Sequence, residues 1–307
     1  MPSMKAIKRR RLTVKNISQI TKAMALVATS KVQKARATLA AVGDPVRATF
    51  DIAYNAISHP DALKLPLIEP RDKIKNTAYI VITANRGLCG GYNSNVCKEL
   101  IRHARENDKN PIIIPVGTKG RDYLRRRGYN AIDYSPAAET ASFSDACKLS
   151  DLLVSMYAEG KIDEVYVVYT KFITILNLEP IVRKVLPVEP AYLSRVVGDI
   201  KNEEEWEDLG FFPRPALRQS TNTEIEYEPG LTEVLAGVVP WYLNMFMYAA
   251  MASSLLCEQA ARMTSMDSST NNASEIIDKL TLQFNRQRQS IITQEITEIV
   301  SGANALQ

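Results

Sequence analysis

A heptad repeat near the C-terminus constrains this chain more than any other feature of its sequence. Alternating steps of three and four residues from Ala249 to Ile291 meet apolar side chains throughout, with three polar interruptions. Such a narrow stripe is typical of a coiled-coil helix. At about 1.5 Å of rise per residue the stripe is roughly 63 Å long. One helix cannot bury such a stripe alone, so the sequence predicts a partner helix of similar length.

The N-terminal segment supplies this partner. Ser3 is a candidate N-cap, small and apolar residues recur at heptad spacing from Ile7 to Val42, and Gly43 before Asp44-Pro45 predicts the helix end. Its length of roughly 57 Å suits the C-terminal stripe. Because the two helices flank a compact insert, we expect an antiparallel pair. The seam residues predicted on the two helices are Val14, Ile17, Met24, Met263, Met266, Ile277, Leu280, Phe284 and Ile291.

Between the helices the periodicity becomes that of an α/β domain. The continuous apolar run Thr77–Thr83 is typical of a strand that is covered on both faces. Further strands are expected at 112–116, 164–170 and 181–188, and helices at 94–106, 119–127 and 144–159. This alternation predicts a largely parallel sheet, with domains at 1–45, 46–229 (sheet core 75–195, irregular segment 196–229) and 230–307. The acidic stretch Asn202–Asp208 is expected to form a surface loop or an extra hairpin, a candidate docking site.

The stretch Val234–Cys257 holds 24 residues without a charge, which is long enough to cross a membrane. Pro240, Asn244 and the continuing heptad register favour a buried or partner-facing helix instead. The basic N-terminus is followed by no apolar run, so no secretory signal is expected, while a mitochondrial targeting helix stays open.

The Gly-rich turn Thr83–Asn95 lies between a strand and a helix, where phosphate-binding loops occur. Its glycines fit neither dinucleotide nor P-loop spacing, and no lysine follows to reach a phosphate. A tight structural turn is therefore favoured over nucleotide binding.

The first 43 residues carry ten Lys or Arg and no Asp or Glu. Such a helix could follow a nucleic-acid backbone, but its charges surround an apolar seam and aromatic residues are absent. An acidic protein partner is the favoured interpretation.

Catalytic and metal-binding patterns are missing from the sequence. Two His and four Cys fall in unrelated places without CxxC pairing, and neither GxSxG nor HExxH occurs. We therefore expect no catalytic site, no metal and no cofactor, and reduced thiols in a cytosol-facing protein.

Beyond Ile291 the heptad register fails. Ile292, Ile296, Ile299 and Ala303 form a different apolar stripe, at 3.6-residue spacing. The helix tip is therefore expected to face a partner that is not in this chain.

Three segments together resemble the gamma subunits of F-type ATP synthases. They are Val14–Ala35 in the first helix, the turn Thr83–Asn95, and Ile292–Ala305 at the C-terminus, and Glu258–Ala273 extends the similarity. The resemblance implies a long antiparallel coiled coil with an inserted Rossmann-like α/β domain. An initiator Met directly before the first helix is similar to bacterial forms.

The resemblance implies the central rotor shaft, which couples proton flow through a membrane c ring to ATP synthesis or hydrolysis at beta subunits. The implied partners are three alpha and three beta subunits, epsilon and the c ring, at the cytoplasmic face of the cell membrane. The implied contacts with beta are Arg9, Lys22, Met24, Arg288, Gln289, Thr293 and Glu295. A Rossmann-like nucleotide-binding enzyme and a basic nucleic-acid-binding protein remain as alternatives.

Overall fold

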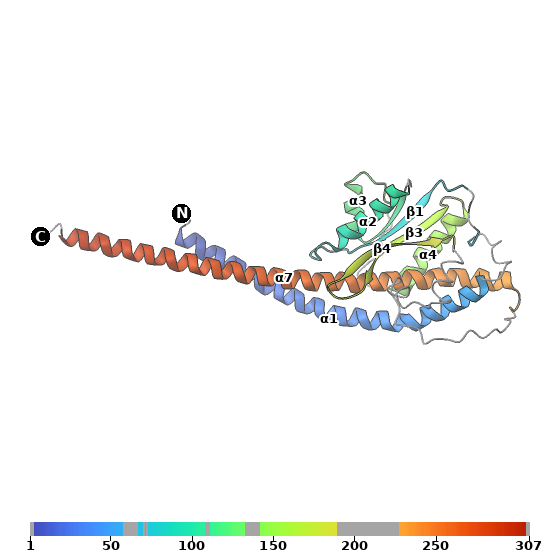
Figure 1. Cartoon of the computed structure of the whole chain (residues 1–307), viewed down its shortest axis with the longest axis horizontal. Helices are drawn as coiled ribbons and strands as arrows, with labels where there is room; N and C mark the ends of the chain where they lie inside the picture. Colours follow the sequence, from blue (N-terminus) through green and yellow to red (C-terminus); the bar gives the residue numbers. More distant parts are fainter. Residues whose placement is uncertain are drawn as a thin grey trace. The chain divides into compact units, whose positions relative to one another are not determined.

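A computed structural model describes residues 3–57, 67–69, 71, 73–107, 111–132, 142–188 and 227–304. The chain, whose helices and strands are labelled in Figure 1, divides into two units: unit 1 comprises residues 1–28 and 263–307, and unit 2 comprises residues 29–262. The acidic stretch Asn202–Asp208 and the rest of 196–226 lie outside the described residues.

Unit 2 is built around a four-stranded sheet of order β2-β1-β3-β4. Its strands are β1 (Thr77–Ile82), β2 (Pro111–Val116), β3 (Glu164–Phe172) and β4 (Leu178–Leu186). β1 pairs in parallel with β2 and β3, and β4 pairs antiparallel with β3. The prediction of a largely parallel sheet is confirmed, and the strand expected at 181–188 is the antiparallel edge strand β4.

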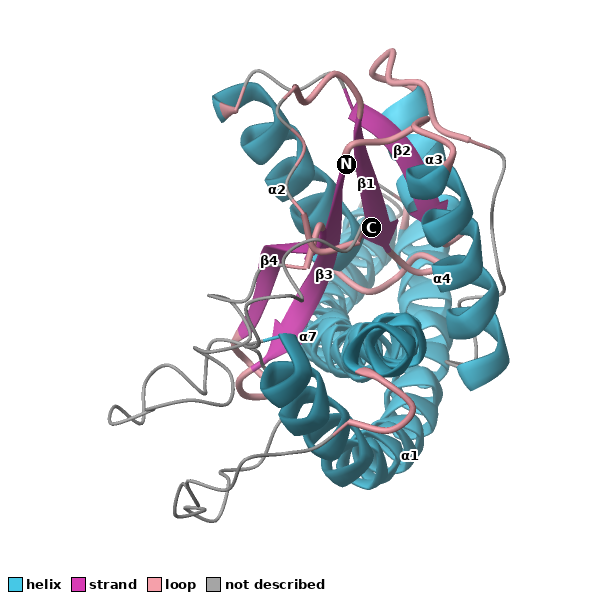
Figure 2. Cartoon of the chain, turned by 90° about the vertical axis from the view of Figure 1, so that its right-hand side faces the viewer, coloured by secondary structure: helices cyan, strands magenta, loops and turns pink. Residues whose placement is uncertain are grey.

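Helices cover both faces of this sheet (Figure 2). On one face, α2 (Tyr92–Glu106) and α3 (Thr118–Arg125) pack against the β1 side chains of Tyr79 and Val81. On the other, α4 (Phe143–Ala158) and part of α7 (Leu231–Asn304) pack against Ala78, Ile80 and Ile82. Because successive strand residues point to opposite faces, a continuously apolar strand can serve both layers. The predicted strands and helices of this domain are thus present.

The first helix is longer than predicted: α1 spans Met4–Ile57 and passes through Gly43 and Pro45. Gly and Pro inside a helix cost about 1 and about 3 kcal/mol. Burial of large side chains, worth about 1.5–3 kcal/mol each, offsets that cost. Val46 and Phe50 are fully buried in the core beneath the sheet, with Ile57 beyond them. Tertiary packing therefore overrides the local stop signal.

The uncharged stretch Val234–Cys257 lies within α7 and supplies much of the unit 2 core. Tyr242, Leu243 and Phe246 are at most 1% exposed. By length and composition, Leu231–Ser301 is the one helical segment of the described chain that could cross a membrane, and 56% of its most apolar window is buried within the protein. That burial agrees with the expected core role.

In each unit, contacts between α1 and α7 run in opposite chain directions. In unit 2, Trp241 Nε1 donates to Thr49 Oγ1 at 3.0 Å, while Leu256 clusters with Val32 and Ala35. In unit 1 the Thr21 and Thr270 hydroxyls lie 2.7 Å apart, and the Arg11 guanidinium lies 5.4 Å from the centre of the Phe284 ring. As numbers rise along α1 they fall along α7, so the contacting segments are antiparallel.

Candidate functional site

The helix pair of unit 1 buries small and apolar side chains along one line. On α7, Met266, Ala273 and Leu280 are 3–6% exposed, and on α1 Ala25 and Ala28 are equally buried. The remaining seam residues predicted on α7 are half-buried: Met263, Ile277, Phe284 and Ile291. Alanine on α1 leaves room for the larger residues of α7.

The structure corrects one seam residue on α1. Val14 and Met24 are half-buried, whereas Ile17 is 48% exposed and Ser18 is less exposed in its place. From Val14 the next position toward α7 lies four residues on rather than three. The side chain three residues after Val14 lies on the other side of the stripe from the one four residues after it. Only the position of α7 decides which of the two is buried.

The residues expected to touch a beta subunit all lie in unit 1, some on α1 and the others on α7. Arg9 and Lys22 are exposed on α1, where Met24 is half-buried. The second group, exposed on α7, consists of Arg288, Gln289, Thr293 and Glu295. The Thr293 hydroxyl donates to the Gln289 carbonyl at 2.9 Å, within the turn of α7 that links these two residues.

Large apolar side chains on α1 lie exposed outside the seam. Leu12, Ile20, Leu26 and Val27 are 58–66% exposed. At 100° per residue they lie on the side of the helix away from Thr21 and its α7 contact. An exposed apolar strip of this kind marks an interaction surface. The sequence contained the signal, since these residues are apolar but fall outside the heptad steps.

The tip of α7 continues this exposed apolar character. Ile292, Ile296, Ile299 and Val300 are 47–71% exposed. The predicted change of stripe after Ile291 therefore coincides with side chains that no described residue of this chain covers. An apolar partner surface is what such a tip requires.

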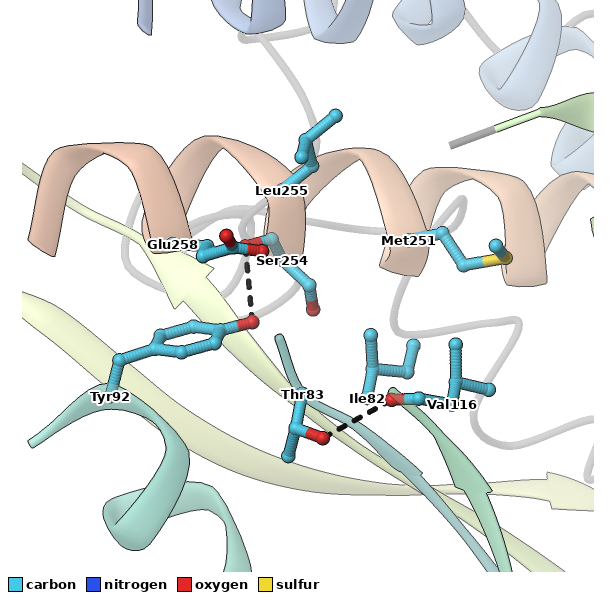
Figure 3. A pocket seen from close by; sticks show the side chains of 8 residues that line it. All are labelled: Ile82, Thr83, Tyr92, Val116, Met251, Ser254, Leu255 and Glu258. Carbon is cyan, nitrogen blue, oxygen red and sulfur yellow. Dashed lines mark hydrogen bonds between the residues drawn. The ribbon is translucent and has the colours of Figure 1, made fainter. Parts of the chain in front are cut away.

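Unit 2 holds α7 through the Gly-rich turn and its neighbours (Figure 3). The Tyr92 hydroxyl donates to the Ser254 carbonyl at 3.1 Å. From α7, the Ser253 hydroxyl and the Cys257 thiol both donate to the Thr170 carbonyl at the end of β3, at 3.0 and 3.4 Å. These bonds tie one side of α7 to β3 and to the start of α2.

An ion pair closes the same junction. Arg262 Nη1 lies 2.7 Å from Glu258 Oε1, with the two side chains 11% and 10% exposed. Arg262 Nη2 also donates to the Gly87 carbonyl at 3.4 Å. The charged end of Arg262 thus links α7 to the Gly-rich turn.

The Gly-rich turn is fixed by side chains rather than shaped to hold a phosphate. Asn93 Oδ1 accepts from the Ala84 amide at 2.8 Å, and Asn85 Oδ1 accepts from the Thr118 amide at 2.9 Å. Thr83 Oγ1 donates to the Val116 carbonyl and accepts from the Gly120 amide. These bonds support the interpretation as a tight structural turn, because its polar groups are used internally.

The buried thiols and the buried phenol of Tyr92 in unit 2 are poorly suited to chemistry. Burial raises the pKa of the Cys257 and Cys89 thiols, and raises that of Cys97 to about 12. Burial, with nearby Glu258, also raises the pKa of Tyr92. All stay protonated at neutral pH, so none is an activated nucleophile. Within the described ranges, no group of three or more His, Cys, Asp or Glu side chains could hold a metal ion.

The chain is similar over its whole length to proteins of one kind. A family model described as ATP synthase matches residues 3–306. A protein of Alkaliphilus metalliredigens called ATP synthase gamma chain is 39% identical over 304 residues, which cover 99% of this chain and 98% of the relative. A gamma chain of Desulforamulus reducens is 38% identical over 308 residues and covers 100% of both chains.

Solved structures show a similar fold. A chain of the Euglena gracilis mitochondrial ATP synthase, solved with OSCP, F1 and the c-ring, matches with a TM-score of 0.64 and 17% identity, over 99% of this chain and 94% of that chain. A chain of the Tetrahymena thermophila mitochondrial central stalk and c-ring matches with a TM-score of 0.54 and 22% identity, over 81% of this chain and 98% of that chain.

Proposed function

This chain belongs to the gamma-chain family of ATP synthases, and from that premise we propose that it is the central rotor shaft of an F-type enzyme. It would couple proton flow through a membrane ring of c subunits to ATP synthesis or hydrolysis at the beta subunits. The full-length match to gamma chains carries this proposal and favours it over a nucleotide-binding enzyme or a nucleic-acid-binding protein.

The finer architecture follows from the same premise. Residues 1–45 and 230–307 form an antiparallel coiled coil, and 46–229 form an inserted Rossmann-like α/β domain. Unit 1 stands inside a ring of three alpha and three beta subunits, while the α/β domain docks on epsilon and the c ring. In a bacterial cell the chain would then be a peripheral protein on the cytoplasmic face of the membrane. These boundaries, partners and location remain predictions.

Surface composition supports the placement of unit 1 inside a ring of other subunits. The strip around Leu12 and Ile20, and the tip around Ile296 and Ile299, expose apolar area that no described part of this chain covers. The exposed cations Arg9 and Lys22 suit an acidic element of a beta subunit. Together they provide apolar contact area and charge steering.

Asymmetry of the shaft supplies the coupling. A pair of different helices inside a pseudo-threefold ring presents a different face to each beta subunit, and so stabilises a different conformation in each. The coupling free energy is the difference between those contacts. It is reciprocal, so rotation can drive synthesis and hydrolysis can drive rotation.

The junction between α7 and the sheet transmits the torque. Rotating α7 about its axis within unit 2 would break the bonds from Ser253 and Cys257 to Thr170, and the contact between Arg262 and Gly87. The two bonds to Thr170 are buried, so water does not readily replace them, whereas the Arg262 contact lies at the surface. The turn near Gly87 therefore acts as an anchor for the shaft.

Co-purification tests the proposal directly. A tagged full-length chain, expressed in its native background, is expected to bring down large alpha and beta subunits with ATPase activity. The chain alone should hydrolyse no ATP, because the proposal assigns the catalytic sites to the beta subunits. ATP turnover by the purified chain alone would reject the proposed role as rotor shaft. Purification of the tagged chain without alpha and beta subunits would reject it as well.

Charge reversal at Lys22 together with Arg9 is expected to reduce ATP-driven proton pumping several-fold more than it reduces assembly. Both side chains are exposed, so folding should not change, and the loss would lie in contacts with beta. Pumping is measured in membrane vesicles with a pH-sensitive dye, relative to ATPase activity. The control reverses Lys31 and Lys34, also exposed on α1. An equal pumping-to-ATPase ratio in both variants would remove Arg9 and Lys22 from the coupling surface.

A further inference from the structure

An open hollow lies between α2 and α3, on the face of the sheet away from α7. Its volume is about 810 Å³, within the range of about 300–1,000 Å³ typical of ligand sites. The half-buried side chains of Ile101, Tyr123 and Tyr129 line it, and exposed charged side chains surround it: four cations, including Lys98, and the carboxylate of Glu106. An apolar, aromatic floor is thus combined with a positive rim.

Three of the cations on the rim lie on one face of α2, and only the middle one has acidic partners among the described residues. Lys98, Arg102 and Arg105 follow one face of α2 at spacings of four and three residues, where like charges repel. Arg102 is neutralised by Glu99 and by Glu106, whose Oε2 lies 2.9 Å from Arg102 Nη1. Lys98 and Arg105 form no ion pair with any described residue. Their charge therefore remains available to an anion.

Arg127 faces the same hollow from beyond the end of α3, and it is held in place. Its guanidinium carbon lies 3.6 Å from the centre of the Tyr123 ring, and Nη1 donates to the Tyr123 carbonyl at 3.3 Å. It also makes no ion pair within the described part of the chain. A guanidinium stacked on a ring loses less freedom when it binds a phosphate, and its other N–H groups can donate to phosphate oxygens.

We propose that this hollow binds a nucleoside triphosphate without reacting with it. The base lies against the Tyr129 and Ile101 floor, and the phosphate chain extends along Lys98, Arg105 and Arg127. From Lys98 to Arg105 the helix rises about 10 Å, which suits a chain of phosphates better than one small anion. The site is separate from the Gly-rich turn and does not depend on the proposed shaft role, although it would let a nucleotide act on the α/β domain directly.

Binding to the purified full-length chain tests the proposal. Titration calorimetry with ATP, with tripolyphosphate and with adenosine separates the anionic and aromatic contributions. We expect ATP to bind at least about tenfold more tightly than tripolyphosphate or adenosine, and we expect the affinity for ATP to fall as the salt concentration rises. Tripolyphosphate binding as tightly as ATP, or an absence of ATP binding, would overturn the proposal.

Charge reversals on the two faces of the sheet locate the site. The double variant Lys98→Glu, Arg127→Glu should weaken ATP binding by more than about tenfold, since it replaces two charge-assisted contacts by repulsion. Lys148→Glu, an exposed lysine on α4 across the sheet, should leave binding unchanged. All these residues are exposed, so circular dichroism should show native folding. Equal effects from the two variants would reject this location.

Photolabelling extends the test to the assembled complex. Irradiation with 2-azido-ATP should label a peptide of this chain that contains Tyr123 or Tyr129, and the double variant should lose that label. A partner protein covering the hollow would leave this chain unlabelled while the complex binds nucleotide elsewhere, and that result would also overturn the proposal.

Discussion

Replacing Arg262 by alanine is expected to lower the free energy of unfolding by about 3–5 kcal/mol, because it removes the guanidinium partner of a buried carboxylate. The Glu258 and Arg262 side chains are 10% and 11% exposed, and their charged atoms lie 2.7 Å apart. The variant also loses the Arg262 contact with the Gly87 carbonyl. Urea-induced unfolding, followed by circular dichroism, measures the change.

The chain contains a matched control for this experiment. Arg102 and Glu106 form the same kind of pair, four residues apart on a helix, but their side chains are 58% and 54% exposed. Arg102→Ala should cost less than about 1 kcal/mol, because water screens an exposed pair. A double variant, Glu258→Gln with Arg262→Met, should recover most of the lost stability, since neither charge is then buried. Equal costs for the two single alanine variants would refute the role of burial.

Replacing Gly117 by alanine is expected to destabilise unit 2 by about 3 kcal/mol or more, through a steric clash added to backbone strain. A Cβ atom at this position would lie 2.1 Å from the Thr83 carbonyl oxygen, and the φ angle of Gly117 is +101°. The clash would displace the backbone of Thr83, which begins the Gly-rich turn that contacts α7. The soluble yield of the variant and the urea concentration at its unfolding midpoint would both fall.

Two other glycines separate the causes of this effect. Gly128 has a φ angle of +82° but no atom within 4 Å of a built Cβ, so Gly128→Ala should cost about 1–2 kcal/mol from strain alone. Gly87 has neither a positive φ nor a close neighbour, so its alanine variant should stay within about 0.5 kcal/mol of the wild type. A loss at Gly117 no larger than that at Gly128 would show that the Thr83 contact is unimportant.

Periodicity predicted the sheet elements well. A six-residue strand buried on both faces needs continuous apolar sequence, and 77–83 is such a run, so β1 was found almost to the residue. The prediction that the first helix ends at Gly43 was wrong, because a local stop signal carries no information on the burial of Val46 and Phe50 farther along the chain. Whether the helix continues depends on the cost of Gly43 and Pro45 relative to the gain from burial, and the side chains that provide this burial meet only after folding.

The candidate site was predictable to a lesser extent. The register change after Ile291 predicted an exposed apolar tip, and Ile292 and Ile299 are exposed as expected. The contacts that tie α7 to unit 2 were not predicted, because Arg262 lies far in the sequence from Gly87, and Cys257 lies far from Thr170. The hollow between α2 and α3 was not predicted either, because its lining residues come together only when the two helices pack.

The sequence by itself determined that a long C-terminal stripe needs a helical partner, because exposed apolar area of that length is unfavourable in water. It also determined the α/β alternation, since the two periodicities are local properties of the chain. Only the tertiary structure decided that Ser18 rather than Ile17 faces inward, and that α1 continues to Ile57. Those outcomes depend on where α7 and the sheet lie, and packing between distant segments sets that arrangement.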